Sequence, residues 1–200
     1  MQNVTLTPGI FIDRDGVINA NRSDHVKRWE EFIFLPGALD ALRTLADRPA
    51  PIIVITNQAL IGRGIVPAAI VEDVHARMRA VVAAAGGRID DVYLCPHRPE
   101  DGCDCRKPRP GMLLRAAHAH GLDRSRSYFI GDALSDVQAA AAAGVTPIFV
   151  SSGRGAEQRE ALLADPWLRG TLIVDDLAAA VEVIVEAQSH PHRPRFCAGA

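Results

Sequence analysis

The sequence predicts an α/β fold, with a Rossmann-like parallel sheet and helices on both of its faces. Two observations lead to this prediction. Short apolar runs alternate along most of the 200 residues with segments whose apolar side chains recur at helical spacing. The runs are apolar at successive positions, as in Ile-Ile-Val-Ile at 52–55, which is typical of strands covered on both faces. We therefore expect one domain over residues 1–188, since no interdomain linker interrupts the pattern.

A strand is expected wherever a short apolar run leads into polar or glycine residues. The first run, Ile-Phe-Ile, leads into Asp13, and the second ends in Thr56. The fourth, Tyr-Phe-Ile, leads into Gly131. The expected strands cover residues 10–13, 51–56, 92–94, 127–130, 147–150 and 171–174.

Helices are expected between these strands. The first opens with Pro-Gly and places Leu39, Leu42 and Leu45 at helical spacing, and glycines follow the second, third and fourth, where they commonly end helices. The expected helices cover residues 36–48, 67–85, 111–120, 134–143, 157–164 and 177–188. The long connection at 19–35 is predicted to form a flap or hairpin, and 189–200 a flexible tail. The histidines on these helices are expected to be surface or capping residues: His75, His118 and His120.

Composition and charge exclude several classes of function. Basic and acidic residues nearly balance, 22 against 24, and no basic stripe is present, so we expect no nucleic-acid partner. The first residues lack the basic start and long apolar stretch of a signal peptide, and no segment approaches the roughly 20 apolar residues of a membrane span. We therefore expect a cytoplasmic monomer with no membrane partner, whose four cysteines are thiols or metal ligands.

Asp13 and Asp15 follow the first strand, and Gly16 comes directly after them. In open α/β sheets, ligands bind beyond the carboxyl ends of the strands. Alternation along an extended chain predicts that both carboxylates point the same way and that Arg14 points away. Two carboxylates so close repel each other unless a cation or a proton lies between them, so we interpret them as a catalytic or metal-binding pair. The alternative is that they are ordinary turn residues.

Other polar groups follow the later strands. Thr56, Asn57 and Gln58 offer a hydroxyl and two amides that suit the oxygens of an anion, or else form a helix cap or turn. Arg106 and Lys107 together suit a phosphate group, or else are a solvated basic pair.

A second acidic pair, Asp132 and Asp136, follows the strand at 127–130. These carboxylates lie at the start of a predicted helix, so the alternative to a functional role is simple capping of that helix.

A cluster of metal-ligand residues lies between two of these groups. Cys95, His97, Cys103 and Cys105 place three thiols and one imidazole within eleven residues. This is a standard ligand set for a tetrahedral structural Zn²⁺, and it leaves no open position for a catalytic water. The alternative is four unrelated residues in an irregular loop. A disulfide between Cys103 and Cys105 is disfavoured, because it would close a small and strained ring. We therefore predict a zinc-binding loop that runs directly into Lys107.

In chain order the motifs are Asp-x-Asp-Gly at 13–16, Thr-Asn at 56–57, Arg-Lys-Pro at 106–108 and Gly-Asp-x-x-x-Asp at 131–136. This order resembles the four motifs of the haloacid dehalogenase superfamily, over about residues 10–150. In that superfamily, dehalogenases lack an acidic residue at the position of Asp15, and P-type ATPases carry threonine there. The resemblance therefore implies a phosphatase, with short loops in place of a large cap domain.

The resemblance also implies a role for each residue. Asp13 is expected to attack phosphorus and form an aspartyl-phosphate, and Asp15 to act first as general acid and then as general base. Lys107 and Thr56 are expected to hold the phosphoryl oxygens. The expected ligands of a catalytic Mg²⁺ are Asp13, the backbone carbonyl of Asp15 and Asp132, with Asp136 as an outer ligand or as an acceptor for Lys107.

The segment at 95–112 closely resembles that of D-glycero-D-manno-heptose-1,7-bisphosphate 7-phosphatases. The implied substrate is a small phosphorylated sugar that loses only its 7-phosphate, in nucleotide-activated heptose biosynthesis. Histidinol-phosphate phosphatase domains share this segment and stay the alternative, although Arg14 between the two aspartates favours the heptose enzymes. A zinc-stapled binding module without turnover and a phosphomutase are disfavoured, because the motif residues are complete and no cap insertion is evident.

The same resemblance assigns the substrate-binding residues. Arg63 and Arg106 are expected to bind the retained 1-phosphate, with Asn57 and Gln58 as further contacts. Ala133 stands where relatives commonly carry a basic residue, and the loop at 59–62 is more apolar than the family pattern. Both departures leave the phosphatase chemistry intact and leave the exact sugar and its anomer open.

Overall fold

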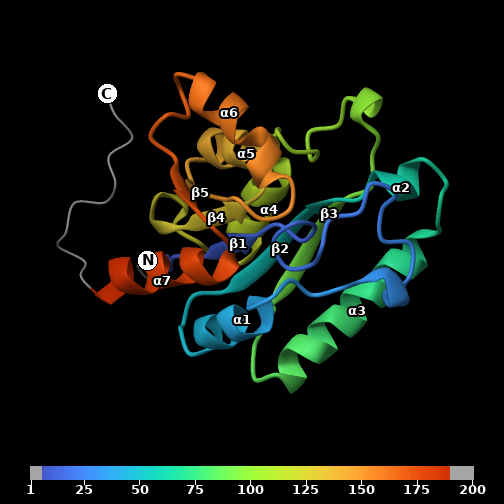
Figure 1. Cartoon of the computed structure of the whole chain (residues 1–200), viewed down its shortest axis with the longest axis horizontal. Helices are drawn as coiled ribbons and strands as arrows, with labels where there is room; N and C mark the ends of the chain where they lie inside the picture. Colours follow the sequence, from blue (N-terminus) through green and yellow to red (C-terminus); the bar gives the residue numbers. More distant parts are fainter. Residues whose placement is uncertain (1–5, 190–200) are drawn as a thin grey trace, which may run out of the picture.

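The computed structural model of the chain describes residues 6–189. Of the tail predicted at 189–200, Ser189 is instead the last residue of a helix, and the rest lies outside the described residues. A six-stranded, fully parallel sheet in the order β3-β2-β1-β4-β5-β6 forms the centre of the molecule (Figure 1). Its strands are β1 (Ile10–Ile12), β2 (Ile52–Asn57), β3 (Asp91–Cys95), β4 (Tyr128–Gly131), β5 (Thr146–Val150) and β6 (Leu172–Val174). The predicted parallel α/β fold is confirmed.

Helices cover both faces of this sheet (Figure 1). One layer consists of α1 (Ala38–Ala46), α3 (Ala68–Ala84) and α7 (Leu177–Ser189), and the other of α4 (Gly111–Ala119), α5 (Leu134–Ala143) and α6 (Gly155–Ala164). The connections contain the short helix α2 (Ala59–Gly62) and the single-turn helices η1 (Trp29–Glu31), η2 (Pro99–Asp101) and η3 (Arg124–Arg126). All six predicted helices are present, while α2 lies in a segment read from the sequence as a loop.

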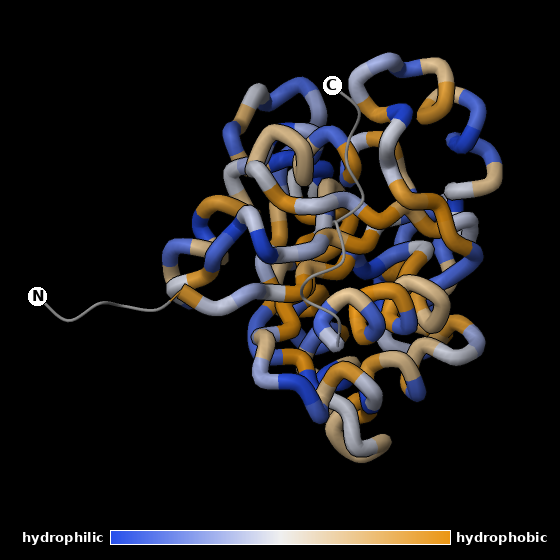
Figure 2. The backbone as a smooth tube through the Cα atoms, turned by 90° about the vertical axis from the view of Figure 1, so that its left-hand side faces the viewer, coloured by the Kyte–Doolittle hydropathy of each residue, from blue (hydrophilic) through white to orange (hydrophobic). Residues whose placement is uncertain are grey.

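The core explains why the strands are apolar at successive positions. Ile10 and Ile12 pack into the hydrophobic cluster beneath α1, α3 and α7, whereas Phe11 between them packs into the cluster beneath α4 and α5. All three side chains are fully buried. Because alternate residues of a strand face opposite sides of the sheet, a strand covered on both faces needs an apolar residue at every position. Figure 2 shows the hydrophobic segments concentrated in the interior of the molecule.

The long connection at 19–35 folds back on itself as a short hairpin. Ala20 N–H donates to the Ile33 carbonyl at 2.8 Å, and Leu35 N–H donates to the Ile18 carbonyl at 2.9 Å. Within the segment the Trp29 and Phe32 rings stack, and Phe34 packs edge-to-face against both. The predicted flap is therefore an ordered hairpin that begins four residues after Asp15.

The order of the strands determines which polar residues meet. β1 lies between β2 and β4, with Ile12 in register with Val54 on one side and with Ile130 on the other. In a parallel sheet the carboxyl ends of neighbouring strands lie at one edge, so the segments after β1, β2 and β4 converge there.

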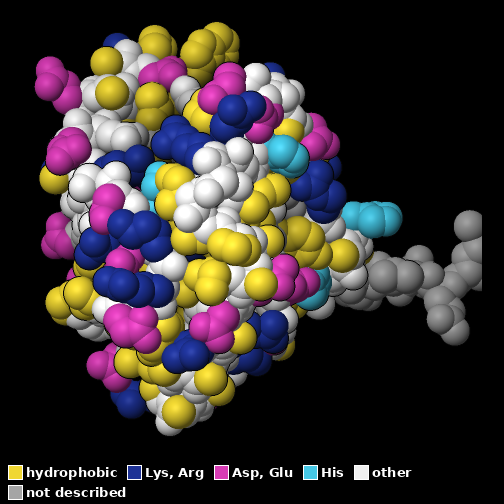
Figure 3. All heavy atoms as spheres, turned by 90° about the vertical axis from the view of Figure 1, so that its right-hand side faces the viewer, with side chains coloured by type: hydrophobic (Ala, Val, Ile, Leu, Met, Phe, Trp, Pro, Cys, Tyr) yellow, Lys and Arg dark blue, Asp and Glu magenta, His cyan; other side chains and the backbone are white. Residues whose placement is uncertain are grey.

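On the side of the molecule seen in Figure 3, Lys and Arg side chains are interspersed with Asp and Glu. Within residues 6–189 no helix has the length and hydropathy needed to cross a bilayer.

Candidate active site and metal centre

Asp13 and Lys107 form a buried ion pair at the edge where β1, β2 and β4 end. Lys107 Nζ lies 2.7 Å from Asp13 Oδ1 and 2.7 Å from Asp136 Oδ1, and it donates to the Ile55 carbonyl at 2.9 Å. The Lys107 and Asp13 side chains are only 3% and 8% exposed. The structure thus brings the first, third and fourth motifs together around one ammonium group.

Electrostatics at this centre are strongly perturbed. Burial, opposed by Lys107 and reinforced by the Asp136 and Asp132 carboxylates, raises the pKa of Asp13 to about 8. Although burial disfavours its ammonium form, the Asp13 and Asp136 carboxylates raise the pKa of Lys107 to about 12. Burial and the Asp136 carboxylate raise the pKa of Asp132 to about 6. The site therefore holds more negative charge than its one lysine compensates.

Asp132 is held by a loop that the sequence interpretation missed. The Arg154 backbone N–H, between β5 and α6, donates to Asp132 Oδ2 at 2.7 Å. Ser152 Oγ donates to the Gly16 carbonyl at 2.7 Å, which ties the same loop to the turn after Asp15. A Cβ atom on Gly16 (φ +93°) or on Gly153 would collide with the Asp132 carboxylate, so both close approaches require glycine. The pattern Ser-Ser-Gly-Arg after an apolar strand was the available signal.

The carboxylates fit a divalent cation. One oxygen atom from each of Asp13, Asp132 and Asp136 lies within 4.8 Å of the others. Asp132 Oδ1 is buried without a hydrogen-bond partner in the described part of the chain, which is a costly state for a carboxylate oxygen. Oxygen ligands of this type are those that Mg²⁺ prefers, and a dication would compensate the excess negative charge.

Asp136 also caps a helix. Its Oδ2 accepts from the Ala133 N–H at 3.1 Å, at the start of α5. Asp136 therefore caps α5 through one carboxylate oxygen and contacts Lys107 through the other. Asp132 does not cap α5, because Ala133 occupies the N-cap position.

Asp15 has an environment of its own. Its Oδ1 accepts from Arg14 Nη2 at 2.8 Å and from Asn19 Nδ2 at 3.0 Å, and its Oδ2 accepts from Gln58 Nε2 at 2.8 Å. Burial alone would raise the pKa of Asp15, but the Arg14 guanidinium and these hydrogen bonds hold it below the usual value. Asp15 thus has a complete set of protein partners.

The prediction that Arg14 points away from this carboxylate is wrong. β1 ends at Ile12, and the chain then turns, with Ile18 and Asn19 N–H groups donating to the Arg14 carbonyl at 2.9 and 3.1 Å. Because the chain is no longer extended, strand alternation does not apply there. The Arg14 side chain is 1% exposed and reaches back to Asp15.

The prediction for His75 is also wrong. This side chain of α3 is 6% exposed, and its Nε2 lies 2.9 Å from Arg14 Nη1. It is therefore part of the interior beside the site. His118 is exposed as expected, and His120 is partly exposed and pairs with Asp91 at 3.0 Å.

The residues at the end of β2 connect the two aspartates. Gln58 Nε2, besides its bond to Asp15, donates to Thr56 Oγ1 at 2.8 Å. The Asn57 side chain donates to the Lys107 carbonyl and accepts from the Lys107 N–H, each at 3.2 Å. These bonds fix the backbone of Lys107 and orient the Thr56 hydroxyl, which is buried at the site.

The two predicted phosphate-binding arginines lie at the rim. Arg63 is exposed at the end of α2. The pKa of His25 is lowered, first by the burial of its ring and then by the Arg63 guanidinium. The Asp15 carboxylate acts on the same histidine with opposite sign. Arg106 is half-buried and donates to the His97 carbonyl at 3.2 Å. Arg63 is therefore free to contact a ligand, whereas Arg106 is tied to the cysteine loop.

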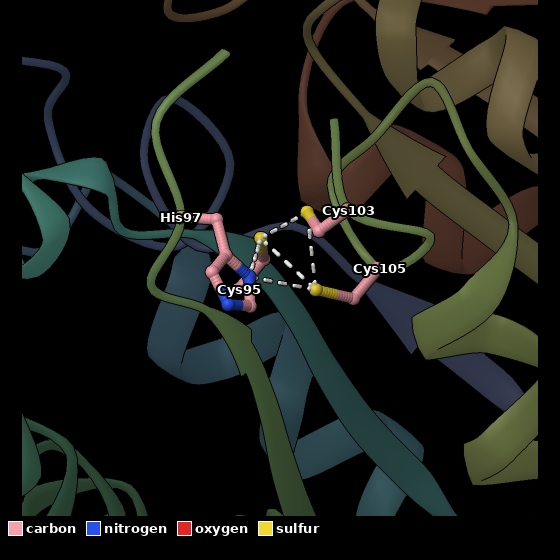
Figure 4. A group of neighbouring side chains, drawn as sticks. All are labelled: Cys95, His97, Cys103 and Cys105. Carbon is pink, nitrogen blue, oxygen red and sulfur yellow. Dashed lines mark hydrogen bonds between the residues drawn. The ribbon is translucent and has the colours of Figure 1, made fainter. Parts of the chain in front are cut away.

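Cys95, His97, Cys103 and Cys105 converge as a tight cluster (Figure 4). The three sulfur atoms are 3.3–3.6 Å apart, and His97 Nδ1 lies 3.2 Å from Cys105 Sγ and 3.6 Å from Cys95 Sγ. A tetrahedral Zn²⁺ with Zn–S bonds of about 2.3 Å places sulfur ligands just under 4 Å apart. The donor set and its geometry fit zinc, with all four positions filled by protein.

Comparison with known proteins places this site in context. The family model of haloacid dehalogenase-like hydrolases matches residues 9–141, and a HAD-hydrolase-like model matches residues 104–180. The D-glycero-beta-D-manno-heptose-1,7-bisphosphate 7-phosphatase of Pseudomonas aeruginosa is 41% identical over 177 residues, which cover 88% of this chain and 97% of that protein. The enzyme of the same name from Escherichia coli is 38% identical over 183 residues, covering 88% and 94%.

A solved structure agrees with these relatives. The crystal structure of D,D-heptose 1,7-bisphosphate phosphatase from B. bronchiseptica, complexed with magnesium and phosphate, superposes with a TM-score of 0.85 at 37% identity. The match covers 90% of this chain and 99% of that one.

Proposed function

The chain belongs to the haloacid dehalogenase-like hydrolases, and from this membership we propose that it is a Mg²⁺-dependent phosphoric monoester hydrolase acting on a phosphorylated heptose. The proposed reaction removes the 7-phosphate of D-glycero-β-D-manno-heptose 1,7-bisphosphate, the substrate in the names of its relatives. The observation that carries the proposal is the contact of Lys107 with Asp13. Asp15, two residues after Asp13, is held separately by Arg14.

Asp13 is the proposed nucleophile. Its Oδ1 accepts from Lys107, which leaves Oδ2 to attack phosphorus and form the aspartyl-phosphate as the P–O bond to the sugar breaks. Asp15 donates a proton to the departing sugar oxygen. It then takes a proton from the water that attacks the aspartyl-phosphate, which releases phosphate and regenerates Asp13.

Lys107 and Thr56 are proposed to bind the transferring phosphoryl oxygens. The ammonium is already oriented by Asp13, Asp136 and the Ile55 carbonyl, and orientation before the reaction is the main contribution that a protein makes to phosphoryl transfer. Mg²⁺ held by Asp13, the Asp15 carbonyl and Asp132 would supply charge neutralisation there. In this proposal Asp136 serves as an acceptor for Lys107.

The rest of the substrate is proposed to lie over the rim. Arg63 and Arg106 are the proposed contacts of the retained 1-phosphate, and Arg63 is the more available because its guanidinium has no protein hydrogen bond among residues 6–189. Asn57 and Gln58 remain proposed substrate-side residues, and their bonds to Lys107 and Asp15 give them a positioning role as well.

The cysteine cluster is the proposed site of a structural Zn²⁺ held by three thiolates and His97. Lys107 follows the last cysteine by two residues, so an ordered loop keeps its backbone in place for Asn57. Metal analysis of the purified protein is expected to give one zinc per chain.

We further propose a single domain over residues 1–188 that acts as a cytoplasmic monomer. The single domain is supported by the one continuous sheet, which α1, α3 and α7 cover on one face and α4, α5 and α6 on the other. Light scattering of the purified protein is expected to give the mass of one chain, and a dimer mass would contradict the monomer.

Phosphate release tests the proposed function. Both anomers of the heptose bisphosphate and histidinol phosphate are compared with Mg²⁺ present and after chelation. The highest kcat/KM is expected for the β anomer, with activity lost on chelation. Asp13→Asn is expected to abolish release, whereas Asp47→Asn, at an exposed position after α1, keeps it. A higher kcat/KM for histidinol phosphate would overturn the substrate, and no release from any of them would overturn the hydrolase.

A further inference from the structure

A buried histidine beside the site has no role in the mechanism above. His75 lies in α3, 61 residues from Arg14 in the sequence, and its side chain is 6% exposed. Buried histidines usually satisfy both ring nitrogens within the protein. The hydrogen bond found for this ring within residues 6–189 is the 2.9 Å contact between Nε2 and Arg14 Nη1.

The chemistry of the two groups fixes the direction of this bond. A guanidinium group carries only donors, so Arg14 Nη1 donates and His75 Nε2 accepts. The imidazole must then be neutral, with its proton on Nδ1. Burial and the Arg14 guanidinium, opposed by Asp15, lower the pKa of His75 to about 3, which agrees with a neutral ring.

Arg14 is fixed at both ends of its fork. Nη1 bonds to His75 and Nη2 bonds to Asp15 Oδ1 at 2.8 Å, while Nε is buried and has no partner among the described residues. The guanidinium carbon also lies 5.9 Å from the centre of the Phe32 ring. Because these two hydrogen bonds are the polar contacts of the guanidinium among the described residues, its position depends on His75 as well as on Asp15.

We propose that His75 is a positioning residue that acts through Arg14 to hold Asp15 in place for proton transfer to the leaving oxygen. This inference rests on the proposed function, in which Asp15 is the general acid. A neutral acceptor suits the task because it orients the guanidinium without competing for its charge. An anionic acceptor at the same place would instead draw Arg14 away from Asp15.

The leaving group distinguishes this role from a merely structural one. A sugar oxygen needs a proton in order to leave, whereas 4-nitrophenolate leaves without one, so only the first reaction depends on the position of Asp15. kcat/KM includes the steps up to departure of the leaving group and is the parameter to compare. His75→Leu removes the acceptor, and His75→Gln keeps one, because its Oε1 can accept from Arg14.

For His75→Leu we expect kcat/KM to fall about 20-fold with the heptose bisphosphate, which is part of the roughly 10²–10⁴-fold that general acid catalysis contributes, and less than about 2-fold with 4-nitrophenyl phosphate. For His75→Gln we expect both values to stay within about 3-fold of the wild type. Met78→Ala, a buried change one turn further along α3, is the matched control and is expected to leave the ratio of the two substrates unchanged.

Equal losses on both substrates in His75→Leu, or no loss, would overturn the inference. Failure of the wild type to hydrolyse the bisphosphate would instead overturn the proposed function, and the comparison would then use another alkyl phosphate. If His75→Leu does not fold, ¹⁵N chemical shifts of the wild-type imidazole decide. A proton on Nδ1 and a bare Nε2 support the inference, and a protonated Nε2 overturns it.

Discussion

Asp13 and Asp15 are two residues apart, yet the protein shifts their pKa values in opposite directions. Asp13 is raised to a pKa of about 8 by burial and neighbouring carboxylates, whereas Asp15 is held below its usual pKa by Arg14, Asn19 and Gln58. Pairs of carboxyl groups pushed apart in this way are typical of sites that assign them different roles. The direction, however, is the reverse of what a nucleophile and a general acid need.

The difference shows that the protein supplies Asp15 with a full set of hydrogen-bond partners, whereas the carboxylates around Asp13 lack one. Asp15 has three hydrogen-bond donors from the protein. Asp13 shares one lysine with Asp136 and faces Asp132, whose Oδ1 has no partner among the described residues. A dication bound by Asp13 and Asp132 would return Asp13 to the ionised form that attacks phosphorus, while substrate phosphate beside Asp15 would favour its protonated form.

Substituting each aspartate in turn tests the comparison most directly. Asp13→Asn is expected to lower kcat by about 10⁴-fold or more because it removes the proposed nucleophile, and Asp15→Asn by about 10²–10³-fold because it removes the proposed general acid. Steady-state phosphate release measures both. The kcat/KM of Asp15→Asn is also expected to fall less with 4-nitrophenyl phosphate than with the sugar phosphate, and equal losses of kcat/KM with both substrates would contradict its assignment as the general acid.

The His75 side of the site makes folding depend on pH. The folded pKa of His75 is about 3, below its unfolded value of 6.5, so the unfolded chain binds the extra proton between these pH values. Its contribution to stability is present above pH 6.5 and is lost as the pH falls toward 3. We expect the loss of this contribution to lower the free energy of unfolding by up to about 3 kcal/mol between pH 7 and pH 4.

Urea unfolding of the wild type and His75→Gln at pH 7 and pH 4 measures this effect. Since glutamine does not titrate, the variant is expected to lose less stability on acidification. An identical pH dependence of the two proteins would show that His75 is not buried as a neutral ring.

Asp132→Asn tests whether the Asp13 side is completed by a cation. The amide keeps the size of the side chain but removes one negative charge, so the Mg²⁺ concentration for half-maximal rate is expected to rise about 100-fold. Titration of phosphate release with Mg²⁺ provides the measurement, with Asp90→Asn, directly before β3, as a control away from the site. A rate independent of Mg²⁺ in the wild type would refute the cation.

Removal of a proposed zinc ligand is expected to act on Asp13 through Lys107, which follows Cys105 by two residues. Cys105→Ser is expected to lose the metal and to lower kcat about 10-fold, because the Lys107 backbone is then held by Asn57 alone. Metal analysis and phosphate release on the same sample check both effects. Zinc loss with an unchanged kcat would separate the cluster from the site.

Arg63→Ala is expected to give the smallest change. Its exposed guanidinium would contribute to substrate binding and not to the chemical step, so KM should rise about 5-fold at constant kcat. A substrate without the 1-phosphate should lose this dependence on Arg63. A fall in kcat would instead place Arg63 near the reacting phosphate.

The parts of the site that the sequence predicted are those coded by local patterns. Asp13 and Asp132 directly follow strands and Thr56 lies near the end of one, and parallel strands bring such residues to one edge whatever surrounds them. The Cys/His cluster could equally be predicted, since its four residues lie within eleven positions of the sequence. Arg14 was misjudged because the chain turns directly after β1, which a rule for extended strands does not anticipate.

By itself, the sequence predicted the fold class and located the four motifs and the Cys/His cluster, because each depends on spacing along the chain. Only the tertiary structure decided what surrounds the two aspartates. His75 reaches Arg14 across 61 residues, and the Arg154 backbone reaches Asp132 across 22. Such contacts arise from how a helix and a loop pack against the strand ends, and no periodic pattern in the sequence encodes them.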